Sequence, residues 1–175
     1  MAAAIFTLLV LGAGGCVSRG PGGITPALSL APQSGARHQC GPTTLASVLG
    51  FHGVPVPEQA ISAAIYSPTA RGVLLMDLAR YAREQGLDAE MRTGSLEDLN
   101  RAVAERHPPI VLLDLGIGGM RIPHFTAVTG GTDHGVFLLG AKPGDEFVSL
   151  PLFERQWKRA GNQFLVVSPA SAPSR

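Results

Sequence analysis

One cysteine lies where the sequence predicts that a helix begins. Cys40 precedes a Gly-Pro pair, and Leu45, Val48 and Leu49 recur behind it at helical spacing. Pro42 suits the first turn of a helix, because no N–H donor is needed there. The thiolate is the nucleophilic form of cysteine, and the unpaired N–H groups and positive dipole of a helix N-terminus support it. Cys40 therefore has the setting that a cysteine nucleophile needs.

A thiol nucleophile also needs a base, and histidine is the usual choice. The histidines of the chain are His38, His52, His107, His124 and His134. His38 is too close to the thiol in sequence to hold a rigid geometry, and His52 lies about 18 Å further along the expected helix. His107 is expected at a helix end and His134 in an exposed turn. His124 opens an expected strand just after the glycine-rich segment 116–119, so it is the candidate base.

Two segments carry a family resemblance. They are Gln39-Cys40-Gly41-Pro42-Thr43-Thr44-Leu45 and His124-Phe125-Thr126-Ala127-Val128, and the histidine follows the cysteine by 84 positions (124 − 40). This pattern resembles the bacteriocin-processing (double-glycine) cysteine peptidase family over about residues 30–168, and residues 150–157 are similar to its free-standing lipoprotein members. The resemblance implies a papain-like fold and a cysteine that attacks a peptide carbonyl while the histidine takes its proton. It also implies a peptide or protein substrate, such as a leader cut after paired glycines.

Two further site positions are implied by the resemblance. The family places an oxyanion-hole glutamine shortly before the cysteine, and Gln33 is the candidate, one residue from the usual spacing; Gln39 is expected to point elsewhere. The family also has an acidic residue that orients the imidazole, commonly just before a proline. Lys142 stands there in this chain, and Asp145 is the nearby candidate for a third member. Because the third residue mainly holds the imidazole, its loss is expected to weaken catalysis without abolishing it.

The elements that must position these residues follow one another as helices first and strands second. Helices are predicted over 41–51, 57–66 and 74–85, after Ser95, and from Pro151; strands are predicted over 88–92, 110–115, 123–129, 135–139, 147–150 and 164–167. This order predicts an α+β domain, with N-terminal helices packed on a C-terminal antiparallel sheet.

The composition limits the classes of partner and cofactor that we expect for this protein. The chain has 175 residues, enough for one domain of ordinary size, and its net charge is +1 with no basic run. We therefore expect no nucleic-acid partner. No Cys/His spacing indicates a metal site, so we expect neither a metal nor another cofactor.

The first residues read as an export segment. The apolar run 2–11 is too short to span a bilayer, which takes roughly 20 residues, and it fits a signal peptide instead. The small residues 12–15 before Cys16 resemble a lipobox, which implies lipidation of Cys16. A plain signal peptide or a short membrane anchor is the alternative. We expect a lipoprotein anchored in the bacterial cell envelope, facing the periplasm or the exterior.

These signals divide the chain into a signal and lipobox segment (1–16), a flexible tether (17–29), a peptidase domain (30–168) and a disordered tail (169–175). A thiol peptidase is the leading interpretation. Two alternatives stay open. One is a cell-wall peptide amidase or acyltransferase that uses the same thiol and imidazole. The other is a peptide-binding pseudo-peptidase, which Lys142 favours and the retained Cys40 and His124 oppose.

Overall fold

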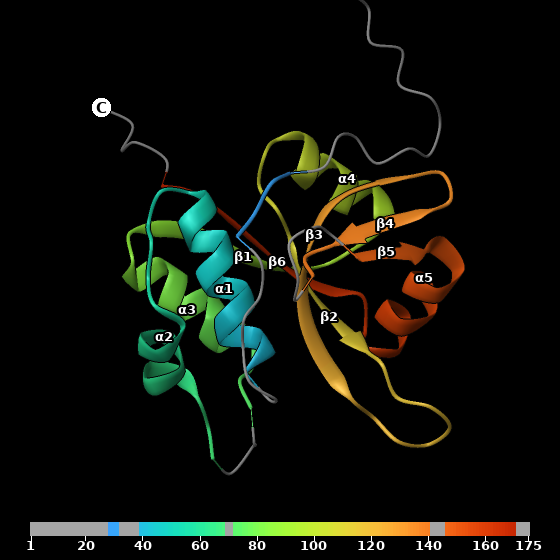
Figure 1. Cartoon of the computed structure of the whole chain (residues 1–175), viewed down its shortest axis with the longest axis horizontal. Coiled ribbons are helices and arrows are strands. Elements are labelled where there is room, and N and C mark those ends of the chain that lie inside the picture. The colour runs from blue at the N-terminus through green and yellow to red at the C-terminus, as the bar shows by residue number, and fades with distance from the viewer. Residues whose placement is uncertain (1–27, 32–38, 69–71, 141–145, 171–175) are drawn as a thin grey trace, which may run out of the picture.

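The computed structural model describes residues 28–31, 39–68, 72–140 and 146–170. Five helices and six strands lie in this part of the chain (Figure 1). The helices are α1 (Cys40–Phe51), α2 (Glu58–Ile65), α3 (Leu75–Glu84), α4 (Leu96–Ala104) and α5 (Leu150–Arg159). Cys16, Gln33, Lys142 and Asp145 lie outside the described residues.

The strands form one antiparallel sheet. They are β1 (Leu87–Thr93), β2 (Ile110–Asp114), β3 (Pro123–Thr132), β4 (Gly135–Leu138), β5 (Glu146–Ser149) and β6 (Gln163–Pro169). Their order across the sheet is β1-β6-β2-β3-β4-β5, so the last strand lies between β1 and β2 (Figure 1). The predicted α+β class, with helices before an antiparallel sheet, is confirmed.

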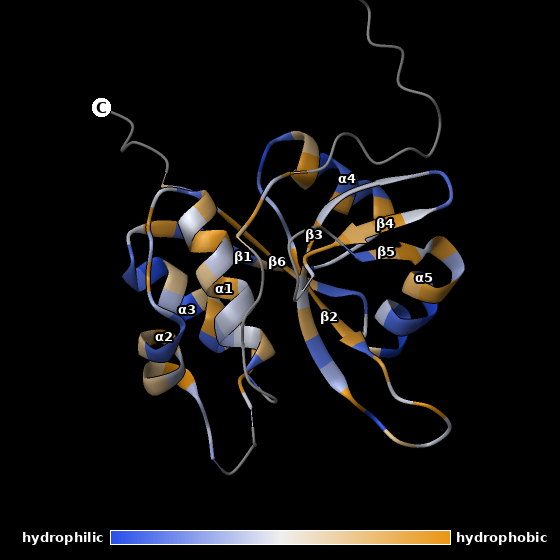
Figure 2. Ribbon diagram, in the orientation of Figure 1, coloured by the Kyte–Doolittle hydropathy of each residue, from blue (hydrophilic) through white to orange (hydrophobic). Residues whose placement is uncertain are grey.

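Alternating side chains of the central strands pack against two layers of helices, one on each face of the sheet. Ile110 in β2 and Leu165 in β6 face a core cluster shared with α1, α2 and α3. Their neighbours Val111 and Phe164 face a second cluster shared with α4 and α5. Figure 1 shows α1–α3 grouped on one side and α5 on the other, and Figure 2 shows apolar residues on the inner parts of these elements. The central strands β2 and β6 are therefore covered on both faces, which explains why they are apolar over most of their length.

Local signals explain where the helices begin. Ser95 accepts a hydrogen bond from the Asp98 amide, and the Asp98 carboxylate accepts one from the Ser95 amide, so α4, predicted to follow Ser95, starts with a capping box. Pro151 lies in the first turn of α5. In α1, the predicted inward residues Leu45, Val48 and Leu49 are fully buried. This helix is thus held against the sheet by its apolar face.

The chain before α1 also contributes to the core. Leu28, which was predicted to belong to the tether, is buried, and its amide donates to the Thr129 carbonyl in β3.

Within the described residues, no helix combines the length and the apolar character that a bilayer span requires.

Candidate active site

Cys40 is the first residue of α1, and its side chain is partly buried. The backbone amide of Phe125 donates a hydrogen bond to Cys40 Sγ at 3.5 Å. Phe125 follows His124 in β3, so this contact brings the two segments of the predicted pair together across the sequence. The sulfur thus lies beside a backbone amide of β3 and at the first residue of α1.

Two further features hold α1 close to β3. The Thr44 hydroxyl donates to the Phe125 carbonyl at 3.2 Å, and both groups are buried. Gly41 leaves room for this approach, because a Cβ there would lie 2.3 Å from Val73 Cγ2 and 3.3 Å from the Phe125 ring. The glycine of the Cys-Gly-Pro sequence is therefore required by packing.

His124 is the second residue of β3 and lies opposite Leu113 in β2. Burial lowers the pKa of His124 below its usual 6.5, because desolvation disfavours the imidazolium, while the charge of Glu146 acts in the opposite direction. At neutral pH the imidazole is therefore mostly uncharged, which is the form that can accept a proton.

Glu146 is an acidic residue that the sequence patterns did not single out, and it lies next to the untested candidate Asp145. Glu146 begins β5 opposite Leu138 in β4 and is exposed to solvent. It is the one acidic residue of the described part of the chain whose charge affects the pKa of His124. The adjacent acids at 145 and 146 were the available signal in the sequence.

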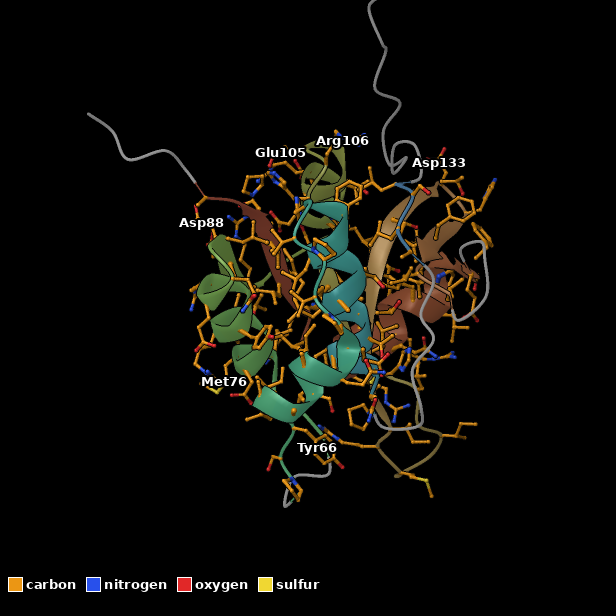
Figure 3. All side chains as sticks on the ribbon, turned by 60° about the vertical axis from the view of Figure 1, so that its left-hand side comes forward. Tyr66, Met76, Asp88, Glu105, Arg106 and Asp133 are labelled. Atoms are coloured by element: carbon orange, nitrogen blue, oxygen red, sulfur yellow. The ribbon has the colours of Figure 1, made fainter. Side chains whose placement is uncertain are left out.

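A mostly apolar cleft of about 690 Å³ opens beside Cys40. One wall comes from Val73, Leu74 and Met76 at the start of α3, and the other from residues 121–123 at the start of β3. Leu74 and Met76 are more than half exposed although they are apolar. Figure 3 shows Met76 projecting from α3, toward the same end of the molecule as Tyr66. An extended peptide could lie in this cleft with its carbonyl next to the sulfur.

A buried carboxylate holds the second wall of the cleft in place, and the sequence patterns did not indicate this role. Asp114, the last residue of β2, accepts hydrogen bonds from the amides of Gly116 and Ile122, both at 3.0 Å. These hydrogen bonds hold the pKa of Asp114 below its usual value. Arg159 of α5 lies 3.1 Å from the second carboxylate oxygen and also donates to the Gly116 carbonyl at 2.5 Å. The loop between β2 and β3 is therefore tied down at both of its ends.

The other histidines that the structure describes lie away from the cleft. His52 follows α1, its ring centroid lies 5.9 Å from that of His107 with the rings tilted by 48°, and burial lowers the pKa of His52. His134 is exposed in the β3–β4 turn, as predicted. Among the described residues, no group of three metal-ligating side chains is close enough to hold a metal ion.

The model of the peptidase C39 family matches residues 31–172. A search of curated proteins found no match. Among solved structures, the chain is similar to a double glycine motif protease from an AMS/PCAT transporter in complex with the leader peptide, at 18% identity and a TM-score of 0.65 over 86% of this chain and 96% of that one.

Two further solved structures are similar. The peptidase domain of Streptococcus ComA, a bifunctional ABC transporter of a quorum-sensing pathway, has 18% identity and a TM-score of 0.62 over 81% of this chain and 98% of that one. A C39-like peptidase from Bacillus anthracis has 18% identity and a TM-score of 0.66 over 86% of this chain and 94% of that one. At these identities the likeness establishes the shared fold.

Proposed function

Because the chain belongs to the peptidase C39 family, we propose that it is a thiol peptidase with Cys40 as nucleophile and His124 as general base and acid. The observation that carries this proposal is the hydrogen bond from the Phe125 amide to Cys40 Sγ. It places the start of β3, where His124 lies, against the helix N-terminus that bears the thiol, beside an open cleft.

The reaction proceeds through an acyl-enzyme. His124 takes the thiol proton as the sulfur attacks the peptide carbonyl, and it then donates that proton to the leaving amine as the C–N bond breaks. A water molecule, deprotonated by His124, attacks the thioester and releases the acid, and the thiol regains its proton. The Cys40 amide and the Gln33 side chain are proposed to donate hydrogen bonds to the oxyanion. Such donors can lower the activation barrier by about 3 kcal/mol.

The substrate class is proposed to be a peptide or a protein leader. A leader peptide is the ligand in one of the similar structures, and the apolar cleft beside Cys40 suits an extended peptide with apolar side chains.

We place the protein, as a second part of this proposal, at the bacterial envelope through lipidated Cys16. Incorporation of a labelled fatty acid that is lost in Cys16→Ser would support the anchor, and unchanged incorporation would refute it.

A peptide bearing a thiol-directed electrophile tests the catalytic assignment. We expect the full chain to be labelled at Cys40, with peptide mapping by mass spectrometry as the readout. Cys40→Ala should abolish this labelling, and His124→Asn should slow it on the order of a hundredfold. Labelling of Cys40→Ala at the same rate as the unchanged chain would sink the assignment.

A further inference from the structure

Arg121 is the one charged side chain among the described residues that line the cleft beside Cys40. Its neighbours on that wall are Ile122 and Pro123, and the opposite wall is formed by apolar side chains of α3, with Leu74 and Met76 exposed. The Arg121 side chain is exposed to solvent, so we expect a pairing with an anionic ligand there to have the modest strength of a surface ion pair.

Arg121 has no ion-pair partner in the described part of the chain. The ion pairs there involve Arg80, Arg92, Arg101, His107 and Arg159. The nearby carboxylate of Asp114 is already occupied by Arg159 and by two backbone amides. The charge of Arg121 acts on Asp114 only as the smallest of the causes that lower the pKa of that carboxyl, so it remains available to a ligand in the cleft.

The backbone that carries Arg121 is held in place. The Leu115 amide donates to the Ile122 carbonyl at 2.9 Å, and Arg159 donates to the carbonyls of Gly116 and Met120. Gly116 packs so tightly that a Cβ there would lie 1.9 Å from the Met120 carbonyl oxygen. This loop joins β2 to β3 (Figure 1), and Arg121, which it carries, lines the cleft. Ordering a preformed site costs less on binding than ordering a free loop.

We infer that Arg121 is a specificity-determining residue that binds a carboxylate of the peptide substrate near the bond to be cleaved. The inference rests on the proposed peptidase function and narrows its substrate to peptides that pair apolar side chains with an anionic group. That carboxylate is either an Asp or Glu side chain or the C-terminus of the substrate chain. Guanidinium recognises both through the same two-pronged hydrogen bonding.

The test compares matched peptide probes on the full chain. Electrophilic probes identical except for Glu, Gln or Lys, moved one position at a time, are compared by their rate of labelling at Cys40. A second set of quenched peptides differs only in a free or amidated C-terminus and is compared by its rate of hydrolysis. In one set or the other, we expect the anionic member to react on the order of fivefold faster than its neutral counterpart. Whichever set shows the preference identifies the source of the carboxylate.

The variants make the assignment to Arg121 specific. Arg121→Gln should bring the anionic-to-neutral ratio to about one, and Arg121→Glu should make the Lys probe the faster one or favour the amidated peptide. Arg155→Gln, which removes an exposed cation of α5 outside the cleft, should keep the ratio. A ratio that survives Arg121→Gln, or no charge preference in either set, overturns the inference alone. If no probe labels Cys40 and no peptide is hydrolysed, the peptidase function falls and the inference falls with it.

Discussion

The backbone amide of Phe125 donates a hydrogen bond to the sulfur of Cys40, although 85 positions separate them in the sequence. The next link between the same elements is the hydroxyl of Thr44, which donates to the Phe125 carbonyl. One residue of β3 thus contacts both the first residue and the second turn of α1. These two hydrogen bonds hold the start of α1 against β3, and the proposed chemistry depends on that contact.

Gly41 and Gly50 offer a matched pair of substitutions within α1. A Cβ at Gly41 would lie 2.3 Å from Val73 Cγ2, whereas a Cβ at Gly50 would have no neighbour within 4 Å. We expect Gly41→Ala to lower the free energy of unfolding by about 1–3 kcal/mol, because Val73 is β-branched and yields poorly. We expect Gly50→Ala to raise it by about 0.5–1 kcal/mol through helix propensity. Urea unfolding measures both, and equal effects would contradict this packing.

The pH dependence of kcat/KM should report the environment of His124. Because burial lowers the pKa of His124, the imidazole stays neutral to lower pH, and the acidic limb of the profile should lie below the ordinary value of about 6.5. Glu146 acts to raise that pKa. Glu146→Gln should therefore move the acidic limb further down in pH.

The control for this shift is Glu154→Gln, which removes an exposed carboxylate of α5 that does not affect the pKa of His124. Its profile should match that of the unchanged protein. An acidic limb that stays in place or moves upward in Glu146→Gln would show that Glu146 does not act on the catalytic base.

The pair formed by Asp114 and Arg159 should matter more for peptides than for small reagents. Asp114→Asn weakens the hydrogen bonds that the side chain at 114 accepts from the amides of Gly116 and Ile122. Arg159→Met removes the hydrogen bond that Arg159 donates to the Gly116 carbonyl. We expect KM for a peptide to rise several-fold in both variants while kcat changes less, because the loop forms a cleft wall. The rate of Cys40 alkylation by iodoacetamide should stay unchanged. A parallel loss of both rates would point to general loss of the fold instead.

Stability should fall in mild acid because two histidines are partly buried. The pKa values of His52 and His124 are lowered mainly by burial, so the unfolded chain binds more protons than the folded one below the ordinary pKa of about 6.5. The free energy of unfolding should decrease from about pH 6.5 down to the folded pKa values. His52→Gln should reduce this decrease, and His134→Gln, at an exposed turn, should not. Urea midpoints at about pH 7 and 5.5 decide the matter.

Much of the fold could be predicted because its signals are local. The capping box between Ser95 and Asp98 set the start of α4, and Pro151 set the first turn of α5. The apolar spacing of Leu45, Val48 and Leu49 predicted which face of α1 is buried. Each of these depends on residues a few positions apart, which a single sequence displays directly.

Long-range contacts could not be predicted in this way. Nothing local indicates that β6 pairs between β1 and β2, because an antiparallel strand of this composition fits several places in a sheet. The ion pair of Asp114 with Arg159 joins β2 to α5, and the influence of Glu146 on His124 joins β5 to β3. The nearness of Cys40 to the start of β3 was expected from the family resemblance, since no spacing rule implies it.

Cys40 is proposed to become acylated during peptide hydrolysis. Acid quenching of a single turnover, followed by mass spectrometry of the intact chain, detects this acyl-enzyme. We expect a transient mass increase equal to the acyl fragment, mapped to Cys40, that rises before the product and is missing in Cys40→Ala together with hydrolysis. Hydrolysis that continues at the same rate in Cys40→Ala would contradict it.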